Sequence, residues 1–238
     1  MCHGVALFHP VAHLLYPLSE LLFPRLCVVC GNCLVESERY ICSACLADLP
    51  VVENSRDAGK NILDTFPLPF RPCRFYSLFY YNKYSDYRQL LFAVKYRSRK
   101  KLGVYLGRML GACIPADAGI DGIVPVPLHP LREKERGFNQ AFQIALGIRE
   151  VTGLEIYSDV LVRIKDNVSQ TEKTAGERKE NVENIFKLHD PVKVMGKHIL
   201  LVDDVMTTGA TLGACMLALR GAENVSFSLA CVAQAADF

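Results

Sequence analysis

The chain has 238 residues, of which 50% are hydrophobic and 22% are charged, and its formal net charge is +2. These proportions are ordinary for a folded globular protein, and the length suffices for one α/β domain with a small additional module. The net charge is too small to indicate nucleic-acid binding through bulk electrostatics, so any such interaction would depend on a local patch.

An apolar segment from Val5 to Phe23 begins the chain. Two prolines, two histidines and a glutamate interrupt it, so it falls short of the roughly 18 apolar residues that a membrane-spanning helix needs. No basic region precedes an apolar core, as it would in a secretory signal. We therefore expect a helical segment that packs on the rest of the protein, and a cytoplasmic location.

Two C-x-x-C pairs follow, Cys27 with Cys30 and Cys42 with Cys45, with eleven residues between the pairs. This spacing is typical of a structural zinc site in which four thiolates surround the ion. A redox role is less favoured, because no strand–helix context surrounds either pair. Cys33 is close enough to replace one ligand or to be a bystander. The cysteines farther along the chain have apolar neighbours and are expected in the core; they include Cys113, Cys215 and Cys231.

Residues Arg56–Pro72 are rich in Pro, Asp, Asn and Gly and are predicted to form a linker. A strand is predicted over Phe75–Tyr81, and apolar periodicity predicts helices over 87–94 and 102–110. The densest basic run of the chain, Lys95–Lys101, lies between these helices. It is either a patch for pyrophosphate or nucleic acid, with Tyr96 available to stack on a base, or a solvated corner.

The next predicted strand, Asp121–Val126, enters a loop with two prolines that ends at Pro130. Leu128 and His129 keep their backbone N–H donors in this loop. His129 could contact a substrate, act as an acid or base, or simply be hydrogen-bonded. Arg136 then precedes a predicted helix with Phe142, Ala145 and Leu146 inward, where it could meet an anion near the N-terminus.

Asn139 suits the cap of that helix, and Gln140 carries little independent signal. A strand is predicted over Val160–Ile164. The polar stretch Lys165–Asn181 has few apolar residues to anchor it, which suits a loop that closes over a substrate. Phe186 returns to the core.

The stretch Ile199–Thr211 organises the chain: an apolar strand ends in Asp203 and Asp204, a loop of small and hydroxylated residues follows, and a helix begins. Backbone N–H groups at such a helix start attract phosphate, and the two carboxylates suit sugar hydroxyls or a Mg²⁺ ion. The alternatives are a plain turn or another kind of Mg²⁺ pair. The predicted phosphate loop comprises Val205, Met206, Thr207, Thr208, Gly209, Ala210 and Thr211. A last buried strand is predicted over Val225–Val232.

This stretch resembles the phosphoribosyl-diphosphate (PRPP) signature of type I phosphoribosyltransferases. Together with Pro125–His129 (PVPLH) and Arg136–Gln140 (RGFNQ), it resembles the ComF family of competence-associated proteins. This family is related to a DNA-utilization protein. The resemblance implies a doubly wound α/β fold with a mostly parallel sheet over 73–238. It also implies an N-terminal helical segment with a four-cysteine zinc ribbon over 1–59.

The resemblance further implies the roles of charged residues around PRPP and Mg²⁺. Asp203 and Asp204 would hold the ribose, while Arg136, Lys173 and Arg178 would neutralise the leaving pyrophosphate. The loop at Leu128 and His129 would contact pyrophosphate through backbone N–H groups, although its prolines depart from the small residues usual there. Gln170, Arg178 and Asn181 follow the family's order in the closing loop.

Two functions are consistent with these features. The first is a PRPP-dependent transferase acting on an unidentified nitrogenous acceptor. The second is a non-catalytic sensor of PRPP or nucleotides in DNA uptake, whose zinc ribbon binds DNA or a protein partner. The intact carboxylates and the long charged loop favour the transferase, because a sensor would not require such a loop. A zinc-ribbon protein without a ligand is a more distant alternative.

Overall fold

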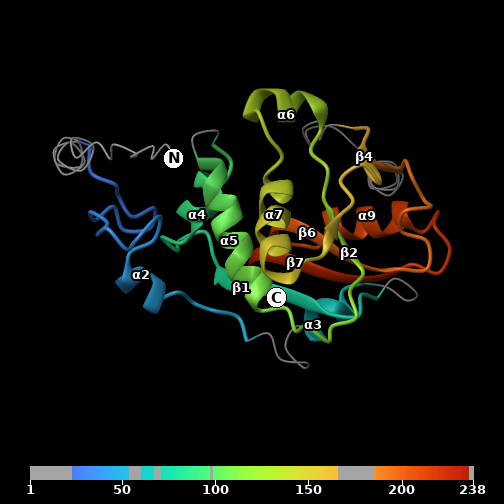
Figure 1. The fold of residues 1–238 in the computed structure, drawn as a ribbon, viewed down its shortest axis with the longest axis horizontal. Helices are drawn as coiled ribbons and strands as arrows, with labels where there is room; N and C mark the ends of the chain where they lie inside the picture. Colours follow the sequence, from blue (N-terminus) through green and yellow to red (C-terminus); the bar gives the residue numbers. More distant parts are fainter. Residues whose placement is uncertain (1–22, 54–59, 67–70, 97–98, 166–184, 236–238) are drawn as a thin grey trace, which may run out of the picture. The chain divides into compact units, whose positions relative to one another are not determined.

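The computed structural model describes residues 23–53, 60–66, 71–96, 99–165 and 185–235 (Figure 1). The chain forms two compact units, Met1–Leu49 and Pro50–Phe238. The predicted domain bounds of 1–59 and 73–238 stay a prediction. The predicted helical segment before Phe23 lies outside the described residues. Within the described part, no helix has both the length and the apolar character to cross a membrane.

The first unit is built of tight turns around its cysteines. A single bridge joins Leu26 to Cys33, and the short helix α2 (Ser43–Ala47) begins at the second cysteine pair. Glu38 ties these turns together, because its carboxylate accepts from the backbone N–H of Val35 and from both the N–H and the hydroxyl of Ser43. These hydrogen bonds lower the pKa of Glu38.

The second unit alternates strands and helices. Its strands and helices are β1 (Phe75–Tyr81), β2 (Gly122–Pro125), β3 (Glu155–Ile156), β4 (Leu161–Arg163), β5 (Phe186–Leu188), β6 (His198–Met206), β7 (Ser226–Ala235), α3 (Lys60–Asp64), α4 (Arg88–Ala93), α5 (Lys100–Ala112), α6 (Pro130–Arg136), α7 (Gln140–Thr152) and α9 (Ala210–Leu219). The predicted strands and the predicted helices at 87–94 and 102–110 are thereby confirmed to within a few residues.

In the described part of the chain, five strands form one sheet in the order β1–β7–β6–β2–β3, and each neighbouring pair is parallel. The inner strands are apolar over most of their length because helices cover both of their faces. The connection after β2 leads to β3 at one edge, whereas the connection after β6 leads to β7 on the other side. The strand order therefore reverses between β2 and β6, where ligands of doubly wound sheets bind.

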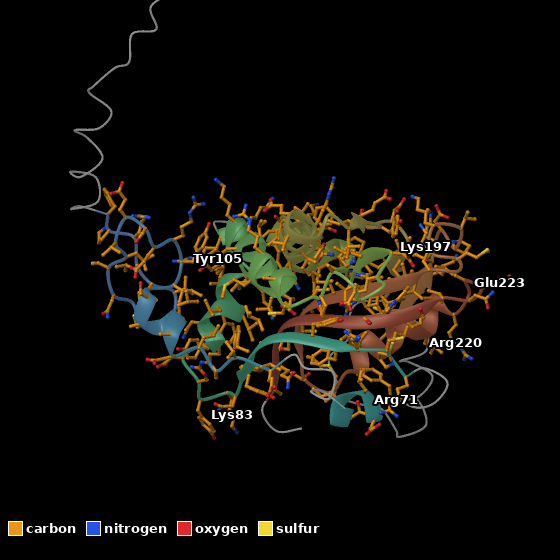
Figure 2. The ribbon with its side chains drawn as sticks, turned by 60° about the horizontal axis from the view of Figure 1, so that its bottom comes forward. Arg71, Lys83, Tyr105, Lys197, Arg220 and Glu223 are labelled. Atoms are coloured by element: carbon orange, nitrogen blue, oxygen red, sulfur yellow. The ribbon has the colours of Figure 1, made fainter. Side chains whose placement is uncertain are left out.

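Helices form a layer on each side of this sheet. α5 and α7 pack together on one face and contact β1, β7, β6 and β2. On the other face, Leu212 and Cys215 of α9 join a core cluster with Ile62, Leu63 and Phe66 from the α3 region. Figure 2 shows α3 (teal) on the side of the sheet away from α5 (green). The predicted doubly wound α/β fold is confirmed.

Glycines allow α5 and α7 to approach very closely. A Cβ atom at Gly107 would lie 2.1 Å from the backbone oxygen of Ile144, and one at Gly147 would lie 2.1 Å from that of Val104. Gly103 and Gly111 continue the same face of α5. The inward residues of α7 also differ from the prediction: Ala141, Ile144, Ala145 and Ile148 are buried, whereas Phe142 and Leu146 are partly exposed.

Two helices were not predicted, and the first of them makes the predicted linker wrong. The predicted linker contains α3, because Ile62, Leu63 and Phe66 bring enough apolar surface to join the core despite the polar residues around them. The segment Pro130–Arg136, for which the sequence predicted no helix, is the helix α6, with Pro130 in its first turn, where a proline is well tolerated.

β4 and β5 pair antiparallel as a separate two-stranded sheet. They flank the segment that was predicted to close over a substrate. Most of that segment lies outside the described residues, including Gln170, Lys173, Arg178 and Asn181, so its role stays a prediction.

Candidate functional site

Two carboxylates lie in the middle strand of the sheet. Asp203 and Asp204 belong to β6, and their exposed fractions are 9% and 5%. The backbone N–H of Asp204 donates to Oδ1 of Asp203 at 2.8 Å. Burial raises the pKa of Asp203 well above its usual range, and the neighbouring charge of Asp204 raises it further. Two adjacent buried carboxylates are costly for a fold, and such groups concentrate at functional sites.

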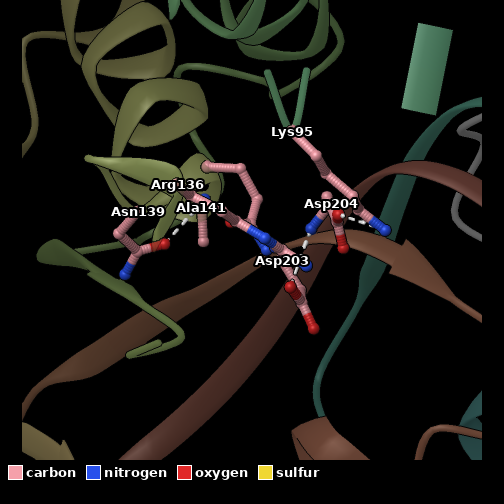
Figure 3. Close-up of polar contacts among 7 residues, drawn as sticks. Lys95, Arg136, Asn139, Ala141, Asp203 and Asp204 are labelled. Carbon is pink, nitrogen blue, oxygen red and sulfur yellow. Dashed lines mark hydrogen bonds and ion pairs between the residues drawn. The ribbon is translucent and has the colours of Figure 1, made fainter. Parts of the chain in front are cut away.

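Lys95 compensates part of this charge. Its Nζ atom lies 3.3 Å from Oδ2 of Asp204. Figure 3 marks this ion pair with a dashed line. The contact is an ion pair without the alignment of a hydrogen bond, since the same oxygen has no hydrogen-bond partner among the described residues. The basic run Lys95–Lys101 thus begins at the site. Among the described residues of this run, Lys95 is the one that contacts the carboxylates. Lys100 instead lies over the ring of Phe138, 5.3 Å from its centroid.

The connection between β6 and α9 is shorter than the stretch Val205–Thr211, whose role as a phosphate loop stays a prediction. Val205 and Met206 belong to β6 and pair with Ala233 and Gln234 of β7, because the parallel ladder continues past the carboxylates. The helix α9 begins at Ala210. The connection is therefore Thr207–Gly209, and the strand–loop–helix pattern itself is confirmed.

Gly209 gives this loop its shape. It precedes α9 with a φ of 72°, a conformation that favours glycine. A Cβ atom there would lie 3.0 Å from Cζ of Phe66 and 3.1 Å from Cε of Met206. Thr207, Thr208 and Thr211 are exposed around it. Their hydroxyls and the first N–H groups of α9 provide donors suited to an anion.

Arg136 ends a helix and does not open one. It is the last residue of α6, where Gly137 follows with a φ of 76°, and the predicted helix α7 begins four residues later at Gln140; that Arg136 meets an anion near the start of α7 stays a prediction. Its Nη1 atom donates to Oε1 of Gln140 at 3.1 Å. Gln140, which is buried, therefore holds the arginine, a role that its sequence position did not reveal. Figure 3 shows the Arg136 side chain directed toward the pair of aspartates.

Asn139 and His129 are helix caps. Oδ1 of Asn139 accepts from the N–H of Ala141 at 2.9 Å, while its Nδ2 donates to the carbonyl of Val126 at 2.9 Å. The predicted cap is confirmed, and it also ties α7 to the end of β2. Nδ1 of His129 accepts from the N–H of Leu131 at 3.4 Å, at the start of α6. Of the alternatives considered for His129, the structure therefore shows a side chain that is hydrogen-bonded within the protein.

Two open cavities lie near these residues. The first, of about 470 Å³, is lined by Phe92, Lys95, Tyr96, Glu135 and Arg136. The second, of about 380 Å³, lies beside the loop after β2, and Pro127, Leu128, Pro130 and Asn139 contribute to its lining. Arg136 and Lys95 thus line the same cavity, and Lys95 also contacts Asp204, whereas Leu128 lines a separate cavity.

The four predicted zinc ligands form one cluster in the first unit. The sulfur atoms of Cys27, Cys30, Cys42 and Cys45 all lie within 4.8 Å of one another. The Cys30 and Cys42 sulfurs are 3.7 Å apart. Zn–S bonds of about 2.3 Å in a tetrahedron imply sulfur–sulfur edges of about 3.8 Å, so the cluster fits zinc. Cys33 is exposed and is not part of the cluster.

The local backbone favours a thiolate at this cluster. Burial alone would raise the pKa of Cys27, but backbone N–H donors from Cys30, Cys42 and Val29 outweigh it and lower that pKa to about 6. Burial and the neighbouring sulfurs raise the pKa of Cys45. A cation among the four sulfurs would stabilise all of them as thiolates. With no open coordination position, the ion would be structural.

Comparisons with known proteins match both units. A model of the phosphoribosyl transferase domain matches residues 140–237, and a model of the double zinc ribbon domain matches residues 18–56. DNA utilization protein YhgH of Salmonella typhimurium is 30% identical over 240 residues, which cover 89% of this chain and 98% of that protein.

Two competence proteins are similar over shorter stretches. Competence protein F of Haemophilus influenzae is 32% identical over 108 residues, or 44% of this chain and 47% of that protein. Competence protein ComFC of Bacillus subtilis is 37% identical over 107 residues, or 44% of this chain and 41% of that protein.

Proposed function

Because this chain belongs to the ComF family and carries a phosphoribosyltransferase fold with a zinc ribbon, we propose that it binds PRPP and transfers the phosphoribosyl group to a nitrogenous acceptor. The observation that carries this proposal is the buried pair Asp203–Asp204, which two residues separate from the loop Thr207–Gly209 with its exposed Thr207 and Thr208. A purely structural strand end would not retain two adjacent buried carboxylates, of which Lys95 compensates only one.

Each part of the site matches one part of PRPP. The N–H groups at the start of α9 and the hydroxyls of Thr207, Thr208 and Thr211 suit the 5-phosphate. The carboxylates can accept hydrogen bonds from the ribose hydroxyls. They also suit a Mg²⁺ ion bound through water, which would supply charge neutralisation of the diphosphate.

In the transfer, the acceptor nitrogen forms a bond to C1 of the ribose and loses a proton, while the C1–oxygen bond breaks and diphosphate leaves with its electron pair. Arg136 is suited to stabilise the negative charge that develops on the leaving group. Lys173 and Arg178 would add to this stabilisation, and the loop Lys165–Asn181 would exclude water. The backbone N–H groups of Leu128 and His129 would contact the diphosphate.

The alternative is a sensor of PRPP or nucleotides without turnover. The observation that favours it is the ribbon, which a small transferase does not need, together with the printed names of the relatives, which refer to competence and DNA utilization. In this case the ribbon would bind DNA or a partner protein in the cytoplasm.

Calorimetric titration of PRPP into zinc-loaded protein, with and without Mg²⁺, tests the proposal. We expect Mg²⁺-dependent binding in the wild type, loss of binding in an Asp203→Asn/Asp204→Asn variant, and unchanged binding in Asp117→Asn, which removes an exposed carboxylate elsewhere. Release of pyrophosphate upon addition of an acceptor base then distinguishes the transferase from the sensor. A folded wild type that does not bind PRPP would rule out the transferase and a sensor of PRPP.

A further inference from the structure

The second cavity forms where the loop after β2 meets α6, α7 and β4. Its volume of about 380 Å³ is within the range of small-molecule sites. We call it the proline cavity, because Pro125, Pro127 and Pro130 line it. Asp203 and Asp204 are not among the described residues of its lining, so a ligand here would bind apart from the carboxylates of β6.

Much of the lining of the proline cavity is apolar. Its three prolines have no backbone N–H groups, so they present ring carbons to the cavity without the donors that other residues would add. Leu128, Phe142 and Leu161 contribute apolar side chains from the loop, from α7 and from β4. Apolar surface of this kind is covered favourably by an apolar group that leaves water. The proline cavity therefore suits the apolar part of a ligand.

Two side chains of opposite charge complete the lining, Arg163 of β4 and Glu133 of α6. Two contacts hold Arg163 in place. Its Cζ atom lies over the ring of Phe186, 5.6 Å from the centroid, and its Nε donates to the carbonyl oxygen of Lys165 at 3.2 Å. The guanidinium fork of an arginine matches the geometry of a carboxylate. Glu133 is exposed, and a carboxylate accepts hydrogen bonds from an ammonium group.

We propose that the proline cavity binds a free α-amino acid with an apolar side chain. The carboxylate of this ligand pairs with Arg163 and its ammonium group pairs with Glu133, while its side chain packs on the prolines and on Phe142. The ligand is thus a zwitterion with an apolar body, and the lining offers one partner for each of its three parts. This inference does not rest on the proposed function.

Other classes of small molecule complement only part of this lining. An apolar acid without an ammonium group would bring its carboxylate close to the like charge of Glu133, and an apolar amine would bring its cation close to Arg163. An amino acid with a charged side chain would place a third charge against apolar groups, where it loses its water without a partner. We therefore expect leucine, methionine and phenylalanine to bind, and aspartate and lysine to bind far more weakly.

Calorimetric titration of L-leucine into the full-length, zinc-loaded protein without PRPP tests the proposal. We expect saturable binding by the wild type. Glu133→Gln and Arg163→Gln should each weaken it roughly 10- to 150-fold, because each removes a hydrogen bond between charged groups. Glu135→Gln is the matched control, since it removes an exposed carboxylate of the same helix that lines the other cavity. Circular dichroism shows whether each variant is folded, and Arg163→Lys keeps the charge without the fork, so it should bind with an affinity between those of wild type and Arg163→Gln.

Ligand analogues test the two charged contacts without any change to the protein. Isocaproate has the carbon skeleton of leucine without the ammonium group, and isoamylamine has it without the carboxylate. Each should bind roughly 10- to 150-fold more weakly than leucine. Isocaproate that binds as tightly as leucine would overturn the pairing with Glu133. Glycyl-leucine that binds as tightly would assign the cavity to the C-terminus of a peptide and overturn the proposal of a free amino acid.

Two further outcomes would overturn the site itself. One is a folded wild type that binds none of leucine, methionine and phenylalanine at millimolar concentration. The other is leucine binding that neither Glu133→Gln nor Arg163→Gln changes, which would place the ligand elsewhere on the protein. Because these titrations contain no PRPP, a failure of PRPP binding leaves their result standing, and a protein that binds PRPP but no apolar amino acid overturns this inference alone.

Discussion

Cysteine has opposite roles in the two units of this chain. In the first unit, four sulfur atoms gather within 4.8 Å of one another at the surface turns. In the second unit, Cys215 and Cys231 are fully buried and are surrounded by the apolar residues of the core cluster, as the sequence predicted. Burial raises the pKa of both of these thiols, which keeps them protonated and unreactive.

The difference reflects how much apolar surface each unit can bury. In the described part of the first unit, Leu34, Ile41 and Leu49 are the buried aliphatic residues, and α2 contributes no buried residue. The second unit buries most of β6 and β7 and half of α9. A module this small needs a metal to compensate for the conformational entropy of folding, whereas a parallel sheet covered on both faces does not.

Removal of zinc should affect the two units very differently, and this is the largest effect that we predict. Apparent binding free energies of structural zinc are about 10–16 kcal/mol, far more than the first unit can replace. A chelator should therefore unfold the residues of the first unit while the second unit keeps its protection. Hydrogen exchange read by mass spectrometry checks this unit by unit. Equal loss of protection in both units would refute the comparison.

A second test addresses the packing that stabilises the second unit. Gly107→Ala would place a Cβ atom 2.1 Å from the backbone oxygen of Ile144, and the helix pair can relieve this contact only by moving apart. We expect a loss of about 3 kcal/mol or more in the free energy of unfolding.

Gly213→Ala is the matched control, since Gly213 is also a helical glycine but the nearest atom of another element to its added Cβ, Cε1 of Phe66, would be 3.6 Å away. Alanine has the better helix propensity, so this variant should be up to about 1 kcal/mol more stable. Urea unfolding of both variants measures the two signs. A loss of equal size in both would show that close packing at Gly107 is not the cause.

The sequence predicted what depends on local patterns. Alternating strands and helices, the cysteine spacing and the strand–loop–helix pattern around Gly209 each involve residues close along the chain, and the structure confirms them. The sequence did not predict α3, because Ile62, Leu63 and Phe66 bury their side chains in a core cluster with residues of α9, far away in the chain. Propensity alone favoured a linker there.

In the candidate site, too, the sequence predicted the features that depend on neighbouring residues and not the contacts between distant ones. The two carboxylates are adjacent in sequence and were found together. Lys95 lies more than a hundred positions before Asp204, so only the fold could show that they form an ion pair. Likewise, the role of Gln140 as the hydrogen-bond acceptor for Arg136 became visible only when the structure placed Arg136 at the end of α6. Pairs separated this far in sequence leave no periodic signal.

The second unit should have a larger free energy of unfolding when the buried carboxylate of Asp203 is removed. Asp203 is buried with a raised pKa, so its ionised form disfavours folding at neutral pH. Asp203→Asn keeps an oxygen that can accept from the N–H of Asp204, and it should stabilise the protein by about 0.5–2 kcal/mol while abolishing PRPP binding.

The pH dependence gives this prediction its sign. Because the folded pKa of Asp203 lies above the unfolded value of about 3.9, the carboxylate costs stability above that unfolded value. The advantage of Asp203→Asn should therefore shrink as the pH falls toward about 3.9, where the wild type binds a proton in both states. Thermal unfolding across this range checks it, with Asp117→Asn as the control. An advantage that grows at low pH would contradict the assignment.

The smallest effect that we predict distinguishes a ligand from a bystander among neighbouring cysteines. Cys33 is exposed, three residues after Cys30, and lies outside the four-sulfur cluster. Cys33→Ser should therefore leave zinc content and the stability of the first unit unchanged, because surface substitutions rarely change stability by more than about 0.5 kcal/mol. Cys30→Ser is the matched variant, since it removes an exposed thiol of the cluster and should lose most of the zinc. Zinc measured by atomic absorption after dialysis decides between them, and loss of zinc from Cys33→Ser would mean that this thiol replaces one of the four ligands.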